Sequence, residues 1–269
     1  ETLSNVSLKV NTTNETDVFE VCGRGELQMA ILIETMRREG YEFMVSKPRV
    51  IIKEENGVKL EPVESVFLDL EEQHVGTITE KLSNRKGKMM NLHNNGFGRV
   101  ILEFKVPSRG MIGFRSQFLT DTKGSGILNS LFHSYSPWFG DIPQRNSGVI
   151  IADRAGKVTP YASLGMADRG ELFVDIGTDV YKGMIVGERN KVGDLDVNII
   201  REKKLTNMRS SSRDNTVVLR PPRKLSLDQC IEFIAEDELI EVTPSNLRIR
   251  KMELDINKRI SQNKKNKNN

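Results

Sequence analysis

The chain has 269 residues, of which 37% are hydrophobic, and a formal net charge of +3. This length fits about two domains with apolar cores, and no window contains the roughly 18 to 20 apolar residues of a membrane span. The two cysteines, Cys22 and Cys230, lie far apart in sequence. They therefore give neither a disulfide framework nor the spacing of a metal site, which is typical of a protein of the reducing cytosol.

Residues 1–53 predict two strands, a helix and a further strand. Val6–Val10 and Val18–Cys22 have the composition of strands, and Tyr41–Ile52 returns as another. Between them, four apolar residues recur on one helix face: Met29, Leu32, Ile33 and Met36. Gly40 is placed to end this helix in the left-handed conformation. Three strands and one helix leave much of a sheet face uncovered, so we expect an incomplete ferredoxin-like domain.

A Gly-x-Gly pair, Gly23 and Gly25, stands directly before this helix. A dinucleotide-binding fingerprint needs a third glycine where Gln28 stands, and the P-loop motif G-x-x-x-x-G-K-[ST] occurs nowhere in the chain. We therefore interpret the pair as a tight turn and expect this chain to bind no GTP or other cofactor.

Residues 54–141 predict the order βαββαβ, the split βαβ or ferredoxin-like arrangement. The predicted elements are a strand at Pro62–Leu70, a helix marked by Val75, Ile78 and Leu82, strands at Gly87–Leu92 and Arg99–Val106, a helix at Gly110–Thr120 and a strand at Ile127–Tyr135. RNA-recognition motifs share this topology, so a free-standing RNA-binding module is an alternative function. An RNA-recognition motif needs exposed aromatic residues on its central strands. The nearest candidate strand, Arg99–Val106, offers only Phe104, and the alternation of apolar and polar residues in this strand indicates that Phe104 belongs to the core.

Residues 142–256 contain short glycine-punctuated runs that predict a mainly β domain. One short helix is expected at Leu227–Ala235, and the run LRIRKME closes the domain as a strand. Residues 257–269 are low in complexity, with five basic and no acidic residues. We expect a disordered basic tail there. The fold class is therefore α+β.

Positive charge is concentrated in the second half of the chain. Residues 201–224 hold eight basic residues against two acidic ones, and clustered charge of this kind indicates a polyanionic partner. This stretch is short of apolar residues, so we expect an exposed loop that recognises RNA backbone and, lacking aromatic residues, does not rely on base stacking. The predicted RNA contacts are Lys203, Lys204, Arg209 and Arg213, supported by Arg223 and Lys224. The alternative is that these charges only solvate a loop.

A second group of basic residues lies at the helix ends of residues 54–141. Its members are Arg85, Lys86, Lys88, Arg109 and Arg115. Such residues either contact RNA or complement helix dipoles, and the sequence leaves both open.

The sequence shows no catalytic motif. His74, His93 and His133 have no His or Cys at metal spacing, and no G-x-S-x-G elbow is present. We therefore expect neither a metal site nor an enzyme, although one sequence leaves open a hydrolase whose residues are dispersed.

The stretch GRGELQMAILIETMRREGYEFMVSKPRVI resembles the BipA/TypA translational GTPases, relatives of elongation factor G. EPVESVFLDL, GRVILEFKVPSRGMIGFRSQFLT, KKLTNMR and PPRKLSLDQ extend the resemblance over nearly the whole chain. The resemblance implies that residues 1–53 correspond to the second half of domain III of elongation factor G and that residues 54–141 correspond to its domain V. Residues 142–256 would be the family-specific C-terminal domain. Because the chain opens on Glu1 in what resembles the middle of a domain, we expect a fragment whose GTPase domain, with GTP and magnesium, lies upstream.

The resemblance also implies partners. Members of this family dock on the ribosome, where the C-terminal domain reaches ribosomal RNA and the acceptor arm of A-site tRNA. We expect a monomer in a bacterial-type cytoplasm or an organelle of bacterial descent, with a parent protein that acts in ribosome assembly or translation under stress. Two features depart from the family: Gln28 replaces a usual His, and SSSRDN replaces a small-residue stretch and adds Arg213.

Overall fold

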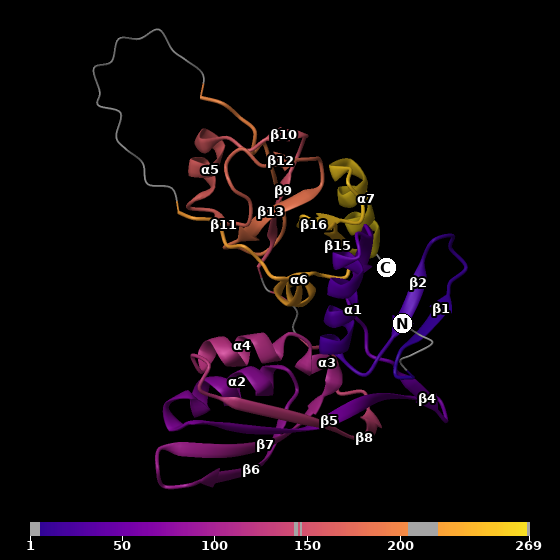
Figure 1. Ribbon diagram of the computed structural model, residues 1–269, viewed down its shortest axis with the longest axis vertical. Helices are drawn as coiled ribbons and strands as arrows, with labels where there is room; N and C mark the ends of the chain where they lie inside the picture. Colours follow the sequence, from indigo (N-terminus) through magenta and orange to yellow (C-terminus); the bar gives the residue numbers. More distant parts are fainter. Residues whose placement is uncertain (1–5, 143–144, 146, 204–219, 268–269) are drawn as a thin grey trace. The chain divides into compact units, whose positions relative to one another are not determined.

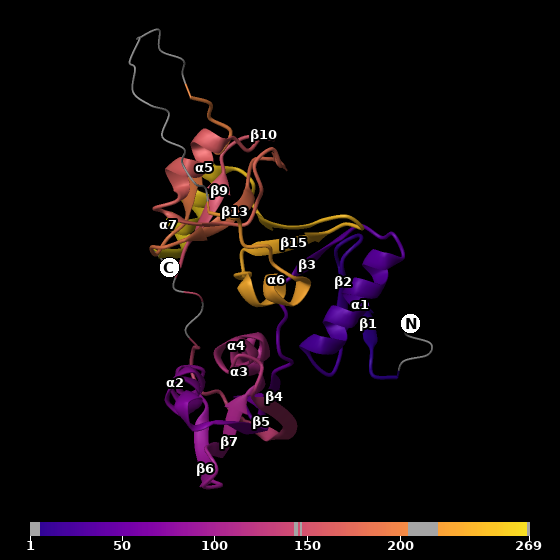
Figure 2. The same ribbon diagram turned by 60° about the vertical axis from the view of Figure 1, so that its left-hand side comes forward.

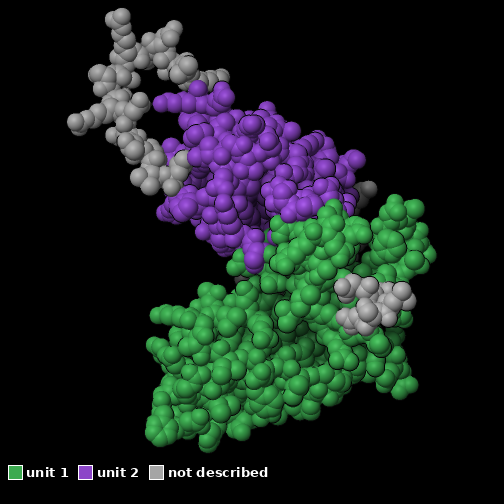
Figure 3. Space-filling view, viewed as in Figure 1, with its two compact units in different colours: residues 1–41, 48–143, 227–232 green, residues 42–47, 144–226, 233–269 purple. Residues whose placement is uncertain are grey.

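The computed structural model describes residues 6–142, 145, 147–203 and 220–267 (Figure 1). The chain forms two compact units of mixed strands and helices, so the predicted α+β class is confirmed (Figure 3). Unit 1 comprises residues 1–41, 48–143 and 227–232, and unit 2 comprises residues 42–47, 144–226 and 233–269. The domain borders predicted at residues 53, 141 and 256 stay predictions.

Unit 1 begins with an antiparallel hairpin and a helix. Strand β1 (Lys9–Thr12) pairs with β2 (Phe19–Cys22), and α1 (Glu26–Arg38) follows. Acidic Glu26 lies in the first turn of the helix and basic Arg37 and Arg38 lie in its last turn, an arrangement that suits the helix dipole. The chain leaves the helix at Gly40, whose φ of +93° is readily adopted only by glycine, as predicted.

The strand predicted over Tyr41–Ile52 is wrong in length and partner. Only β3 (Phe43–Ser46) is a strand, and it pairs with β15 (Glu238–Val242) in the sheet of unit 2 (Figure 2). The expected strand–helix–strand unit therefore does not form one sheet. Alternation identifies a strand but carries no information about the distant strand that receives its hydrogen bonds.

The rest of unit 1 is a complete ferredoxin-like domain, in which the predicted order βαββαβ is confirmed. Its elements are β4 (Lys53–Glu55), β5 (Val58–Glu71), α2 (Val75–Asn84), β6 (Lys88–Asn94), β7 (Arg99–Pro107), α3 (Ser108–Met111), α4 (Phe114–Asp121) and β8 (Ile127–Pro137), with a 3₁₀ turn at Glu72–His74 before α2. The sheet is antiparallel, with β5 between β7 and β8 and with β6 at the far side of β7, while β4 pairs with the start of β5. The second predicted helix is divided because Gly113 adopts a left-handed φ of +72°.

Helices α2 and α4 cover one face of this sheet (Figure 1). The apolar core between them includes Leu68 of β5, Ile78 of α2 and Phe118 of α4, all fully buried. Phe104 is also fully buried, which confirms the prediction that it belongs to the core.

Unit 2 is built on a larger mixed sheet. Its strands are β9 (Val149–Ala152), β11 (Gly170–Leu172), β13 (Met184–Arg189), β14 (Leu195–Val197), β15, β16 (Leu247–Lys251) and β3. The order is β14–β9–β13–β16–β15–β3, β11 pairs with β13, and only the β14–β9 pair is parallel. A separate short hairpin joins β10 (Gly156–Lys157) to β12 (Asp179–Val180).

The prediction of one short helix in the C-terminal domain is wrong. Besides the expected α6 (Leu227–Phe233), the chain forms α5 (Pro160–Met166) within one of the glycine-punctuated runs that predicted a mainly β domain. Thr159 caps α5 by accepting a hydrogen bond from the Ala162 amide at 3.2 Å, and Pro160 occupies the first turn. Both are ordinary signals for the start of a helix. They were overlooked because the glycine-punctuated pattern around them indicated strands.

The prediction of a disordered tail is wrong over α7 (Ile256–Lys267). Polar composition indicated disorder, but the start of the helix has a cap, in which Asp255 accepts the Asn257 amide, and an ion pair between Arg259 and Asp196. Among the helices of the described residues, none is long and apolar enough to cross a membrane.

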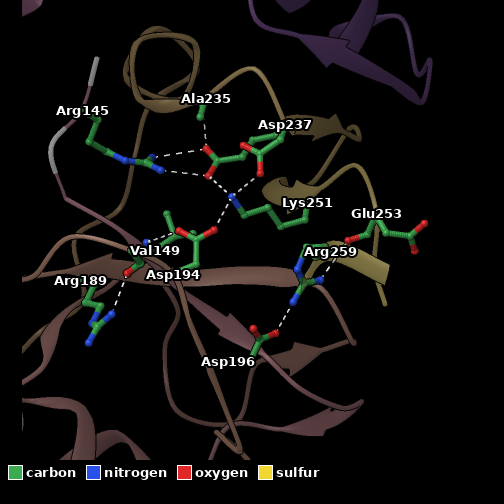
Figure 4. A network of polar contacts seen from close by, with 12 residues as sticks. Arg145, Val149, Arg189, Asp194, Asp196, Ala235, Asp237, Lys251, Glu253 and Arg259 are labelled. Atoms are coloured by element: carbon green, nitrogen blue, oxygen red, sulfur yellow. Dashed lines mark hydrogen bonds and ion pairs between the residues drawn. The ribbon is translucent and has the colours of Figure 1, made fainter. Parts of the chain in front are cut away.

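An ionic network around the buried side chains of Lys251 and Glu238 joins the sheet of unit 2 to its loops (Figure 4). The ammonium of Lys251, only 3% exposed, lies 2.8 Å from Asp194 and 2.9 Å from both Asp237 and Glu238. Glu238 also pairs with Arg145 at 3.0 Å. Burial lowers the pKa of Lys251, but the three carboxylates outweigh it and raise that pKa to about 12.

Candidate nucleic-acid interface

The basic loop leaves the C-terminal sheet beside α5. Residues 204–219 lie outside the described residues, and with them three of the predicted RNA contacts, Lys204, Arg209 and Arg213. The fourth, Lys203, is exposed at the last described position before this segment.

Hydrogen bonds hold the start of the loop against the cap of α5. The Thr159 amide donates to the Ile199 carbonyl at 3.2 Å, and the Thr159 hydroxyl donates to the Arg201 carbonyl at 2.6 Å. Gly156 lies against Ile200, since a Cβ at this glycine would come within 2.8 Å of the Ile200 side chain. These contacts bring β10 and α5 next to residues 199–201.

Three cations and one aromatic ring lie in the region where the basic loop starts. Lys157 of β10, Arg201 and Lys203 are exposed, and the Arg201 guanidinium lies 5.7 Å from the ring centroid of Tyr161, which is 41% exposed. No carboxylate of the described part of the chain forms an ion pair with these three cations. We call Lys157, Tyr161, Arg201 and Lys203 the loop-base surface. It combines the two chemistries that bind nucleic acid, positive charge for phosphates and a π-face for bases.

The basic residues at the other end of the loop are engaged within the domain. Arg223 pairs with Glu171 and Glu188, each at 3.1 Å, and its guanidinium lies 5.2 Å from the Phe173 ring centroid. Lys224 pairs with Asp175 at 3.2 Å. These ion pairs anchor the end of the loop and neutralise two of the predicted supporting contacts.

Two of the five basic residues predicted in unit 1 hold the ferredoxin-like domain together. The Arg85 guanidinium donates to the carbonyls of Gly110 and Ile112, both at 2.9 Å, and to Gln117 at 3.0 Å. It thereby closes the turn between α3 and α4. Desolvation by burial lowers the pKa of Arg85, which reflects how far its charge is withdrawn from solvent.

Arg109 has a similar structural place. It makes a bidentate pair with the fully buried Glu61, at 2.5 and 3.1 Å, and its guanidinium lies 3.7 Å from the Trp138 ring centroid. Glu61 also accepts the Phe139 amide at 2.7 Å. This arrangement fixes the segment after β8 to β5. The remaining three, Lys86, Lys88 and Arg115, are exposed, and none forms an ion pair within the described residues.

The Gly-x-Gly turn is explained by its local contacts. A Cβ at Gly23 would lie 2.3 Å from the terminal methyl group of Met29, so a larger residue there would require this flexible side chain to move. The Gln28 side chain accepts the Arg24 amide at 2.7 Å and donates to the Ser7 hydroxyl. Gln28, the residue that departs from the resembling family, therefore closes the turn with hydrogen bonds.

Sequence reasoning missed Lys157 and Tyr161. The Thr-Pro pair at residues 159–160 signals a helix start and could have placed Tyr161 on a helix. No pattern in the sequence could place that helix beside residue 201. In the described part of the chain, no group of three His, Cys, Asp or Glu side chains is arranged to hold a metal ion.

Comparisons with known proteins match these parts of the chain. Residues 58–146 match the Elongation factor G C-terminus, and residues 147–256 match the TypA/BipA C-terminal domain. Proteins called Large ribosomal subunit assembly factor BipA are 49% identical over 265 residues in Salmonella typhimurium (strain LT2), Escherichia coli (strain K12) and Bacillus subtilis (strain 168). The match covers 98% of this chain but only 44%, 44% and 43% of those relatives, respectively.

Proposed function

Because the chain belongs to the TypA/BipA family and corresponds to the C-terminal part of its members, we propose that it is the ribosome-binding part of a translational GTPase. The relatives' name supports a role in assembly of the large ribosomal subunit, and action in translation under stress is the alternative role. GTP and magnesium would be held by the part of the relatives that this chain does not cover.

The loop-base surface is the observation that carries the RNA-binding part of the proposal. Lys157, Arg201 and Lys203 are exposed near the start of a segment that itself contains Lys204, Arg209 and Arg213. Neutralising phosphates releases counterions and drives sequence-independent association. The partner is therefore structured RNA of the ribosome, with the acceptor arm of A-site tRNA as the second candidate that the resemblance provides.

Tyr161 extends this recognition beyond the RNA backbone. Its ring is partly exposed beside the Arg201 guanidinium, and unpaired bases stack on tyrosine rings and on guanidinium planes. We therefore include stacking on an unpaired base, although the loop sequence alone contains no aromatic residue.

We propose fewer RNA contacts in unit 1 than the sequence suggested. Lys86, Lys88 and Arg115 stay proposed contacts because their charges face solvent. Arg85 and Arg109 are occupied by internal partners, and we assign them to the fold. We further propose that the chain acts as a monomer, in a bacterial-type cytoplasm or in an organelle of bacterial descent.

Co-sedimentation with purified large ribosomal subunits tests the proposal. The 269-residue chain is compared with the triple variant Lys157→Gln, Arg201→Gln and Lys203→Gln, and with the quadruple variant in which Lys203, Lys204, Arg209 and Arg213 become Ala. We expect wild-type binding that weakens with salt and that each variant lowers by about tenfold or more. Equal binding by all three proteins at every salt concentration would refute the assignment of these cations.

A further inference from the structure

We infer that strand β8 of the ferredoxin-like domain is a self-association edge, along which two copies of this chain pair antiparallel when they are free in solution. The inference goes beyond the proposed function, because the partner is a protein and the surface lies in unit 1. It concerns the free chain, whereas the monomer of the proposed function is the form that acts on the ribosome.

Strand β8 (Ile127–Pro137) lies at an edge of its sheet. Among the described residues its only partner strand is β5, so every second residue of β8 directs its amide and carbonyl groups away from the sheet. From Ile127 to Phe132 the pairing with β5 runs without interruption, and the register shift lies beyond Phe132. A regular row of outward-facing backbone groups is the template that another strand needs.

This edge lacks the features that usually keep an edge strand from pairing, which are lysines, prolines and bulges within the strand. The opposite edge of the sheet, β6, has two of them, since it begins with Lys88 and its register shifts between Met89 and Asn91. The β8 stretch ILNSLF, residues 127–132, has no charged residue and no proline. Its Leu131 and Phe132 are 66% and 62% exposed. In this sheet, β8 is therefore the edge that is open to another strand.

The side chains of β8 are arranged symmetrically about Asn129. Ile127, Asn129 and Leu131 share the open face of the sheet, because Leu128 between them is buried in the core under the helices. In an antiparallel pair of two copies centred on Asn129, Ile127 of each copy lies opposite Leu131 of the other. Moving the centre by one residue places Asn129 opposite Ile127 or Leu131 instead. Since the hydrophobic pattern sets the register of a strand pair, the centred pairing is favoured.

Phe67 of β5 extends this apolar face away from the seam between the two copies. It is 37% exposed and lies diagonal to both Ile127 and Leu131 of β8, within reach of their side chains. Two paired copies therefore join their Phe67, Ile127 and Leu131 side chains into one apolar surface across a shared sheet. An edge that complements itself in this way gives a closed two-fold dimer.

The neighbours of the seam also suit a second copy. Asp69 lies on β5 opposite Ile127, and in the centred pairing the same row of the joined sheet ends on Ser65 of the second copy. Like charges therefore do not meet across the seam. On the other face, Phe132 comes opposite Gly126 of the second copy, and an aromatic ring placed over a glycine covers the exposed backbone of an edge. Both faces accept the register that the hydrophobic pattern selects.

Sedimentation velocity over a concentration series tests the pairing. We expect the mass of the wild type to rise from the 30.5 kDa of one chain toward twice that value as the concentration increases. Leu131→Lys removes both apolar pairs of the seam and adds a gatekeeping charge, so it should weaken association by about tenfold or more. Leu92→Lys makes the same change on the β6 edge and should associate as the wild type does. Circular dichroism checks that both variants keep the fold.

A cysteine at the centre of the seam tests the register. In a Cys22→Ser, Cys230→Ala background, Asn129→Cys brings two thiols opposite each other, with Cβ atoms about 4.5 to 5.5 Å apart, close to the span of a disulfide. Mild oxidation should then give a covalent dimer. Asn91→Cys, on the β6 edge, is the control and should give none.

A wild-type chain that remains monomeric at every concentration would overturn the inference. A dimer that survives Leu131→Lys and does not cross-link through Asn129→Cys would also overturn it, because the copies would then meet elsewhere. A third result would assign the edge to a ribosomal partner and so overturn the inference as well. It is a chain that stays monomeric while large ribosomal subunits protect its β8 amides from hydrogen exchange.

Discussion

The ferredoxin-like domain and the C-terminal domain use their arginine and lysine residues differently. In the ferredoxin-like domain, Arg85 and Arg109 are bound to backbone carbonyls and to a buried glutamate. In the C-terminal domain, Arg201 and Lys203 face solvent where the basic loop begins. From the sequence, the first two were cations at helix ends and the last two were cations of an expected exposed loop.

The difference shows that the partner of a cation, rather than its residue type, indicates its role. A guanidinium that satisfies several internal acceptors has no free donors for phosphate, and withdrawing it would leave those acceptors unpaired. An exposed cation without an internal carboxylate retains its charge for an external one. Variants that remove cations of each kind test this difference.

The largest expected effect is on stability, in the ferredoxin-like domain. Arg109→Ala leaves Glu61 fully buried without its ionic partner, so we expect a loss of about 3 to 5 kcal/mol in the free energy of unfolding. Urea denaturation followed by the fluorescence of Trp138, the single tryptophan of the chain, measures it. Arg115→Ala, an exposed arginine of the same domain, is the control and should change stability little. Equal stability of Arg109→Ala and wild type would show that the pair is not structural.

An alkaline titration tests a paired, structural cation in the C-terminal domain. The pKa of Lys251 is raised from 10.5 to about 12, so its stabilising effect is fully present below about pH 10.5 and is lost as the pH rises through about 12. We expect the unfolding free energy of the wild type to fall across this window. In Lys251→Met, which is less stable at neutral pH because three carboxylates lose their cation, this fall should be smaller; it is not absent, because burial raises the pKa of Cys230 to about 12 and so lowers stability over the same window in both proteins. A parallel fall in both proteins would assign the window to another group.

A smaller effect is expected at Tyr161. Tyr161→Leu removes the ring and should weaken binding of a single-stranded RNA by about 1 to 3 kcal/mol, whereas Tyr161→Phe should bind as the wild type does. An oligonucleotide with abasic sites keeps the phosphates and should bind both variants equally. If the leucine variant binds normal RNA as tightly as the wild type, Tyr161 does not stack on a base.

The smallest effect is expected at Lys224. Its ion pair with Asp175 is exposed, with side-chain exposures of 77% and 55%, and such pairs contribute about 0 to 1 kcal/mol. Lys224→Gln should therefore leave the melting temperature and ribosome binding nearly unchanged. A marked loss of ribosome binding would show that this lysine exchanges its internal partner for RNA.

The sequence predicted the fold best where neighbouring residues determine it. Alternation identified β5 and β7, and the helical spacing of Ile78 and Leu82 identified α2, because one face of each element is buried. Helix α5 was missed although its signal, Thr159 and Pro160, is local. The pairing of β3 with β15 could not be foreseen, since it depends on segments about 190 residues apart.

The positive charge of the candidate site could be predicted from the sequence, but the side chains that its cations contact within the domain could not. The excess of basic residues over residues 201–224 can be read directly from the sequence. The engagement of Arg223 by Glu171 and Glu188 depends on the tertiary structure, as does the approach of Tyr161 to Arg201. The ion pair between Arg259 of the basic tail and Asp196 likewise depends on the tertiary structure.

The most direct test of the distinction between free and paired cations compares two double variants at the two ends of the basic loop. Arg201→Gln with Lys203→Gln removes two free charges, and Arg223→Gln with Lys224→Gln removes two paired ones, so the net charge changes equally. The measurement is the slope of log K against log salt for binding to large ribosomal subunits. We predict that the first variant lowers the slope by about 1.4 to 1.8 and that the second leaves it close to the wild-type value. Equal slopes in the two variants would contradict the distinction between free and paired cations.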